Sequence, residues 1–207
     1  KELKSFIKTK KQLAMLLMES WKNKMGKLKY IDSLTPQRNE VYLFDTCILM
    51  YNFYTAGSYR KPLITKCNNL YTKIVKADAK ILIYPELMQE FFNLFIKTEY
   101  QMYLKKHELK EENFQYKEFR RTSEFSDVVA ELKGIYQLQI KPYAITTSSM
   151  ADVDDIFNFL DFITEMDFND MLLCKVAKAN NAKLVSHDSD FILSSLVNSV
   201  DFYFAQS

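Results

Sequence analysis

Four short apolar runs constrain the fold of this chain more than any other feature. They are VYLFD at 41–45, ILIY at 81–84, KLVS at 183–186 and VDFYF at 200–204. Runs of this length and composition are typical of strands buried on both faces. Stretches with apolar residues at helical spacing lie between them, at 63–77, 86–104, 127–138, 152–165 and 169–180. Strands that alternate with helices predict right-handed βαβ units, and therefore a three-layer α/β/α fold around a mainly parallel sheet.

Composition narrows the class of protein further. Gly and Pro are scarce, at 3 and 4 residues, which argues against a loop-rich all-β fold. The three cysteines, Cys47, Cys67 and Cys174, have neither metal-ligand spacing nor a disulfide framework, so a reducing interior is the natural setting. No apolar run approaches the length of a membrane span, and no secretory apolar region follows the basic start. We therefore expect a cytoplasmic protein that does not enter a membrane.

The first 40 residues differ in charge from the rest of the chain. Residues 1–40 hold ten Lys and Arg against four Asp and Glu, a net charge of +6, whereas residues 41–207 carry −4. Apolar residues at helical spacing predict an amphipathic helix over 3–30, with a loop at 31–40. We therefore expect a basic helical extension, 1–40, before one domain, 41–207. This extension suits a polyanionic partner or a solvated lysine-rich helix, and the sequence leaves both open.

Acidic residues gather where the predicted strands end. Asp45 ends the first strand, Asp188 follows the strand at 183–186, and Asp170 opens the helix before that strand. Glu90 lies in the second helical turn after Pro85. Ligands of an open parallel sheet bind beyond the carboxyl ends of its strands, and carboxylates that converge there repel one another unless a cation binds. Mg²⁺ or Mn²⁺ suits such oxygen ligands and activates water for phosphoryl transfer. The pattern therefore predicts a metal-dependent phosphoryl-transfer site.

Three segments resemble those of PIN-domain ribonucleases. FDTCILMY at 44–51 resembles the opening strand, in which an apolar run ends in Asp followed by a small or hydroxylated residue. YPELMQEFFN at 84–93 resembles the second segment, in which Pro precedes a helix that carries a Glu; the alignment selects Glu90 and not Glu86. FNDMLLCKVAKANNAKLVSHDSDF at 168–191 resembles the third, with an Asp that opens a helix, then a strand, Ser, one residue, Asp and Phe.

The resemblance covers residues 41–98 and 166–204 and leaves 1–40 and 99–150 unexplained. It implies a Rossmann-like PIN fold and an endoribonuclease in which a metal-bound hydroxide attacks phosphorus in line. The residues that it implies as ligands of Mg²⁺ or Mn²⁺ are Asp45, Glu90, Asp170 and Asp188. Many bacterial members are toxins inhibited by a small antitoxin protein, and members commonly form homodimers. RNA substrate, antitoxin and a second copy are therefore the partners that the resemblance implies.

Several residues near these acids have both a functional and a structural interpretation. The candidate accessory residues are Ser186, Asp167, Asp190, Glu86 and Thr46. Ser186 could orient water or satisfy a turn, and Asp167 and Asp190 could be outer carboxylates or helix caps. Glu86 fits a helix-start charge, and Thr46 directly follows Asp45.

The unexplained middle of the chain predicts a helical insertion at about 99–130, followed by an extended stretch at 139–145. Lys105, Lys106, Arg120 and Arg121 are interleaved with aromatic residues there and could bind RNA. Neighbouring glutamates cancel most of this charge, so a solvated arm or a dimer contact is the alternative. For the whole protein, the alternative to a nuclease is a non-catalytic PIN-like module that binds RNA or protein.

Overall fold

The strands form one five-stranded sheet with β1 at its centre. A computed structural model of the chain describes residues 28–54, 61–149 and 151–206. The strands are β1 (Val41–Phe44), β2 (Lys80–Ile83), β3 (Ala144–Thr146), β4 (Lys183–Ser186) and β5 (Asp201–Phe204), in the order β3-β2-β1-β4-β5. Every neighbouring pair is parallel. The chain moves outward from β1 to β3 and then returns to the other side of β1, so the topological switch point lies between β1 and β4.

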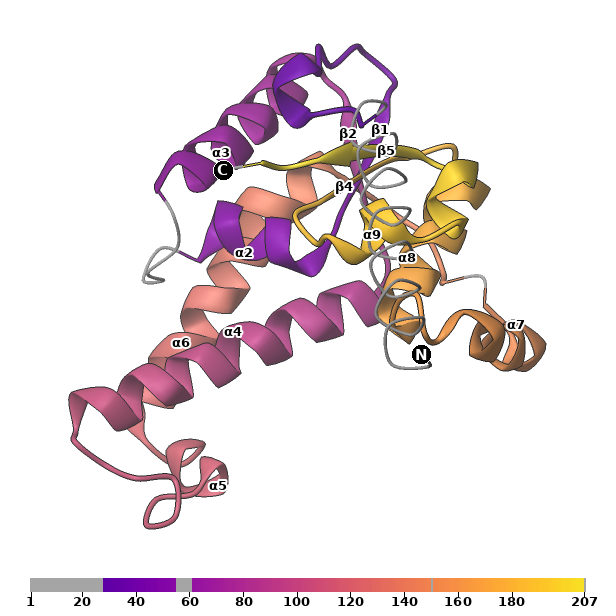
Figure 1. Cartoon of the computed structure of the whole chain (residues 1–207). Coiled ribbons are helices and arrows are strands. Elements are labelled where there is room, and N and C mark those ends of the chain that lie inside the picture. Colours follow the sequence, from indigo (N-terminus) through magenta and orange to yellow (C-terminus); the bar gives the residue numbers. More distant parts are fainter. Residues whose placement is uncertain (1–27, 55–60, 150, 207) are drawn as a thin grey trace, which may run out of the picture.

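Helices connect these strands. They are α2 (Thr46–Phe53), α3 (Lys61–Lys76), α4 (Pro85–Lys106), α5 (Tyr116–Phe119), α6 (Ser123–Gly134), α7 (Val153–Phe159), α8 (Phe168–Ala179) and α9 (Asp190–Leu193). Right-handed crossovers place α2 to α6 on one face of the sheet and α7 to α9 on the other. In agreement, α2 contacts α3 and α4, whereas α8 contacts α7 and the short turn η5 (Leu196–Ser199) (Figure 1). The prediction of an α/β fold with helices flanking a parallel sheet is confirmed. No helix within the described residues is long and apolar enough to cross a membrane.

The four predicted strands match β1, β2, β4 and β5 to within one residue at either end. The edge strand β3 was not predicted, because it is short and its residues are exposed or half-buried, so it lacks an apolar run. The prediction of extended structure at 139–145 was wrong except for Ala144 and Ile145, which belong to β3. Before them, α6 continues into a π-helical turn, η2 (Ile135–Ile140), and then a 3₁₀ turn, η3 (Lys141–Tyr143).

The predicted helix at 3–30 lies mostly outside the described residues. Its last part, from Leu28 to Tyr30, is not helical. Tyr30 forms a parallel bridge with Phe204, whose N–H donates to the carbonyl of Lys29 at 2.8 Å, and Lys29 pairs with Asp201 at 2.6 Å. The prediction was therefore wrong for these residues, which extend alongside β5. Within the predicted loop, Ile31–Ser33 forms a single 3₁₀ turn, η1.

The predicted helical insertion is an arm formed by the far end of α4, by α5 and by the start of α6. Figure 1 shows that this arm projects away from the sheet. Its aromatic residues pack on one another, with Phe119 fully buried and its ring 5.6 Å from Tyr100 and 5.1 Å from Tyr103. The Tyr100 hydroxyl donates to the carbonyl of Phe114 at 2.5 Å. These residues belong to the same hydrophobic cluster as the core around the sheet.

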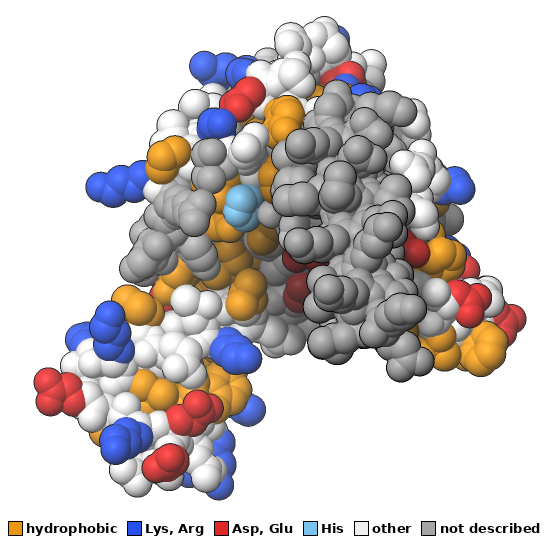
Figure 2. Space-filling model, in the orientation of Figure 1, with side chains coloured by type: hydrophobic (Ala, Val, Ile, Leu, Met, Phe, Trp, Pro, Cys, Tyr) orange, Lys and Arg blue, Asp and Glu red, His pale blue; other side chains and the backbone are white. Residues whose placement is uncertain are grey.

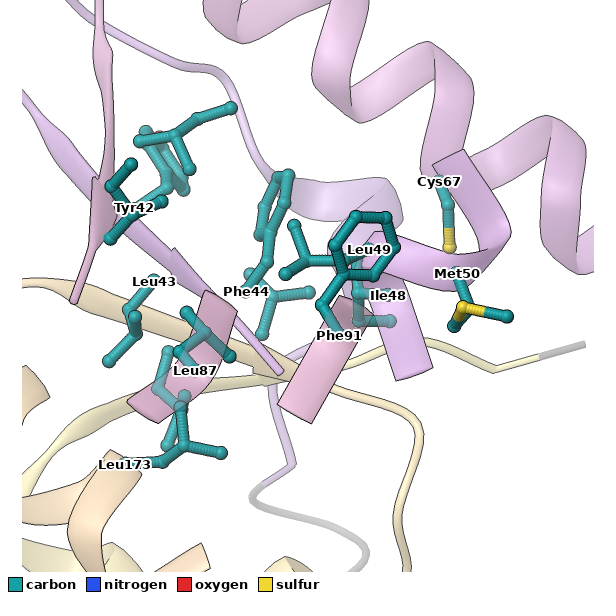
Figure 3. Packing of buried hydrophobic residues seen from close by; sticks show 14 of the residues in the cluster. Tyr42, Leu43, Phe44, Ile48, Leu49, Met50, Cys67, Leu87, Phe91 and Leu173 are labelled. Carbon is teal, nitrogen blue, oxygen red and sulfur yellow. The ribbon is translucent and has the colours of Figure 1, made fainter. Parts of the chain in front are cut away.

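The main core lies where α2 and α4 cover the central strand. Tyr42, Leu43 and Phe44 of β1 are completely buried, as expected of a strand covered on both faces (Figure 3). Phe91 of α4 is also fully buried, and its ring centre lies 6.4 Å from that of Phe53 in α2. This packing fixes the start of α4 against the end of β1, which is where the candidate site lies.

Candidate active site

Asp45 lies at the carboxyl end of β1, at the junction with α2. Its N–H donates to the carbonyl of Val185 in β4 at 3.0 Å, which ties the residue to the neighbouring strand. Its side chain accepts two hydrogen bonds on Oδ2, from Ser186 Oγ at 2.5 Å and from Cys47 Sγ at 3.0 Å. The residue is only 8% exposed. The two donors therefore hold a buried carboxylate in a fixed orientation.

Ser186 joins the ends of the two central strands. It is fully buried, and besides donating to Asp45 its Oγ accepts the backbone N–H of Asp188 at 2.9 Å. Asp188 Oδ1 in turn accepts the N–H of Asp190 at 2.9 Å. The N-cap of α9 is Ser189, and Asp190 is the first residue of the helix. The cap interpretation of Asp190 was therefore wrong.

Asp167 and Asp170 open α8 on the same edge. Asp167 is the N-cap, and its Oδ1 accepts the N–H of Asp170 at 3.0 Å. This confirms the cap interpretation of Asp167 and orders the first turn of the helix. Asp170 is half-buried, whereas Asp167 is exposed.

Three of the acids at this edge have a raised pKa. Burial, followed by the charges of Asp167, Asp45, Asp188 and Glu90, raises the pKa of Asp170 to about 8. Burial and then Asp45 raise the pKa of Glu90. Burial also raises the pKa of Asp45, and the charge of Asp188 raises it further. The hydrogen bonds that the Asp45 carboxylate accepts act in the opposite direction and lower this pKa. The structure therefore brings Asp167 and the other three predicted acids within electrostatic reach of Asp170.

Thr46 adds an unusual hydroxyl to this edge. The residue is only 3% exposed, and within the described part of the chain no atom lies in normal hydrogen-bond geometry with its Oγ1. The hydroxyl nevertheless lowers the pKa of Glu90, so the contact between the two is a weak one. A buried hydroxyl without a full partner carries a free-energy cost. A water molecule, alone or bound to a cation, would remove this cost.

The donor chemistry of the edge fits Mg²⁺ or Mn²⁺. Carboxylates and a hydroxyl are hard oxygen ligands, and Mg²⁺ usually keeps several waters and binds one or two protein carboxylates. Across residues 28–54, 61–149 and 151–206, no three His, Cys, Asp or Glu side chains lie close enough to hold a metal ion directly. The residues therefore fit an ion bound by few carboxylates and by water, and not a cage of protein ligands.

Other candidate residues lie apart from this edge. Glu86, in the first turn of α4, is exposed. Lys105 and Lys106 end α4, and Lys105 is about 22 Å along the helix from Glu90 at 1.5 Å per residue. Arg120 and Arg121 lie on the arm, whose surface carries both charge signs (Figure 2). The four basic residues therefore do not form a basic groove together with the acids.

Cys47 belongs to the site, although the spacing of the three cysteines along the sequence indicated no role for any of them. Burial and then Asp45 raise the pKa of its thiol well above the ordinary value, so the thiol stays protonated and donates. The sequence feature that could have indicated this role is its place in the first turn of the helix that follows Asp45.

His187 contacts the end of β5. Its Nδ1 lies 2.5 Å from the carbonyl oxygen of Ala205, and its ring is stacked on that of Phe204 at 5.7 Å.

The raised pKa of Asp170 predicts how stability depends on pH. An unfolded Asp has a pKa of about 3.9, so between that value and about 8 the folded protein holds a proton that the unfolded chain has released. The contribution of Asp170 to the stability of the metal-free protein is therefore largest at low pH and is lost as the pH rises toward about 8. In EDTA, between about pH 5 and about pH 8, we expect the Tm of the wild type to decrease relative to that of Asp170→Asn. Equal slopes in wild type and variant would contradict this.

No protein-family model matches the chain, and a search of curated proteins found no match. The resemblance to PIN domains therefore still rests on the three segments.

Proposed function

We propose that this chain is a metal-dependent endoribonuclease of the PIN-like kind. The observation that carries the proposal is that carboxylates from three separate segments, Asp45, Glu90 and Asp170, gather at the switch point of the sheet and have a raised pKa. Such an arrangement costs free energy in the absence of a cation. A site that retains it is suited to a divalent ion, and the edge of a parallel sheet is where its substrate would bind.

The proposed roles follow from position and chemistry. The residues that would hold Mg²⁺ or Mn²⁺, one or two of them directly and the others through bound water, are Asp45, Glu90, Asp170 and Asp188. The bound ion supplies an activated water and stabilises charge on the phosphodiester. Ser186 and Cys47 orient the carboxylate of Asp45 through their hydrogen bonds. The Thr46 hydroxyl is available to position a water beside Glu90.

RNA is the substrate class that we propose, because it is the substrate that the PIN resemblance implies. The antitoxin and the homodimer implied by the PIN resemblance extend this proposal. Co-purification from native cells and mass measurement in solution would test these two partners.

A non-catalytic module that binds RNA or protein is the second candidate. The observation that favours it is that no three metal-ligating side chains within the described residues lie close enough to hold an ion directly. A binding module would gain little stability from Mn²⁺, whereas a metal-dependent nuclease would gain more.

Metal addition separates the two candidates. At a Mn²⁺ concentration of about 100 times Kd, binding to the folded state alone adds about 2.7 kcal/mol, which raises Tm by about 5–10 °C for a chain of this size. We expect this rise in thermal melts, together with cleavage of a labelled RNA pool that EDTA abolishes. Neither a rise in Tm nor cleavage would shift the assignment to the binding module.

A further inference from the structure

Helix α7 presents an apolar face to solvent. Val153, Ile156, Phe157 and Leu160 recur at helical spacing and are 84%, 43%, 70% and 51% exposed, and Ile163 continues the row at 44%. Val153, Ile156 and Phe157 belong to α7, where about 100° per residue places them within a sector of about 100°. Leu160 lies in the 3₁₀ turn that follows, η4 (Leu160–Phe162), and Ile163 comes directly after that turn. Single exposed apolar residues are ordinary, but a contiguous stripe marks a surface that binds something. We call these five residues the α7 face.

The other side of α7 is already fixed to the body. Asp155 forms an ion pair with Lys175 of α8, and Phe159 and Phe162 pack against the core. The carboxylate of Asp152 caps the helix by accepting the N–H of Asp155 at 2.9 Å. Since these contacts set the rotation of the helix, α7 cannot turn its apolar face inward. Burial of that face requires another segment.

The negative charge around α7 indicates that such a segment would be basic. Residues 151–168 hold six acidic residues and no Lys or Arg, a net charge of −6. Among them, Asp154 and Asp161 are exposed. A matching segment would be both apolar and basic. Residues 1–27 have eight lysines and two glutamates, a net charge of +6, with Leu3, Phe6, Ile7, Leu13, Leu16, Leu17 and Trp21 at helical spacing.

We propose that residues 1–27 of the same chain cover the α7 face, with their lysines beside the acids of 151–168. The described chain begins near the elements on the same side of the sheet as α7. Leu28 lines a pocket together with Phe191 of α9 and Val197 of η5. From there, η5 contacts α8, and α8 contacts α7. Even as a helix, 27 residues span about 40 Å, which is enough to cross a small domain. The proposal does not depend on nuclease activity.

Carbodiimide cross-linking of the full chain tests the proposal, because it joins lysines directly to carboxylates in contact. We expect monomeric protein to contain cross-links between lysines of 1–27 and Asp154 or Asp161, in a yield independent of protein concentration. Cross-links found only in a dimer and increasing with concentration would assign the α7 face to a second copy and overturn the proposal. Absence of such cross-links would also overturn it.

Hydrogen exchange with a matched pair of variants gives an independent readout. Phe157→Asp places a charge in the α7 face, whereas Leu138→Asp alters an equally exposed side chain, at 75%, in η2. We expect amide exchange within 1–27 to speed up by about tenfold or more in Phe157→Asp and to stay at the wild-type rate in Leu138→Asp. Equal exchange in the two variants would contradict an intramolecular contact.

Discussion

Replacing Asp45 with Asn is expected to reduce metal-dependent RNA cleavage by about three orders of magnitude, equivalent to about 4 kcal/mol of transition-state stabilisation. The reason is that Asp45 is the most buried of the proposed ligands and is held by Ser186 and Cys47. The same change should not lower stability in EDTA, because it removes a buried charge whose pKa is raised by burial and by Asp188. Single-turnover cleavage and thermal melts measure the two effects.

Asp78→Asn is the matched control for this experiment. Asp78 lies before β2, at the amino end of the strands and away from the acids, and its positive φ of 54° is one that Asn tolerates. We expect wild-type cleavage from this variant. Cleavage that survives Asp45→Asn would mean that the site is elsewhere or that a contaminating nuclease is present. Lower stability of Asp45→Asn in EDTA would mean that the carboxylate stabilises the fold.

Replacing Phe91 with Ala is expected to lower the free energy of unfolding by about 3–5 kcal/mol, which is the usual cost of truncating a buried Phe. Phe91 is fully buried, and its ring contacts those of Phe53, Phe92 and Phe95. It also follows Glu90, so the loss of packing acts where α4 meets the candidate site. Urea unfolding followed by circular dichroism measures the change.

Leu94→Ala is the control on the same helix, because Leu94 is 38% exposed and its truncation leaves less of a cavity. We expect it to cost under about 1 kcal/mol. Similar losses in the two variants would show that α4 is loosely packed along this length, and would argue against the tight junction between α2 and α4.

The strands and the acidic edge could be predicted from the sequence because their signals are local. A strand covered on both faces of a parallel sheet is a continuous apolar run, which is how β1, β2, β4 and β5 appear. Parallel strands end on one edge, so Asp45 and Asp188 had to lie near each other once the order of elements was known. The edge strand β3 escaped prediction because its side chains are only partly buried.

Capping partners could not be assigned from spacing alone. Asp188 and Asp190 are both acids at the start of α9, yet the N-cap is Ser189, and only the structure shows that Asp188 accepts the N–H of Asp190 in the turn before the helix. The thiol of Cys47 likewise became part of the site only when the turn between β1 and α2 placed it 3.0 Å from the Asp45 carboxylate. These contacts depend on backbone angles within a turn, which residue types constrain weakly.

By itself, the sequence determined the alternation of strands and helices, the edge at which the acids gather and the amphipathic nature of 152–165. Only the tertiary structure decided which acids interact, because a pKa depends on burial and on charges from segments as far apart as Asp45 and Asp188. It also decided that the apolar face of α7 is exposed. Helical periodicity shows that a helix has an apolar face, but whether another segment covers that face depends on how distant parts of the chain pack.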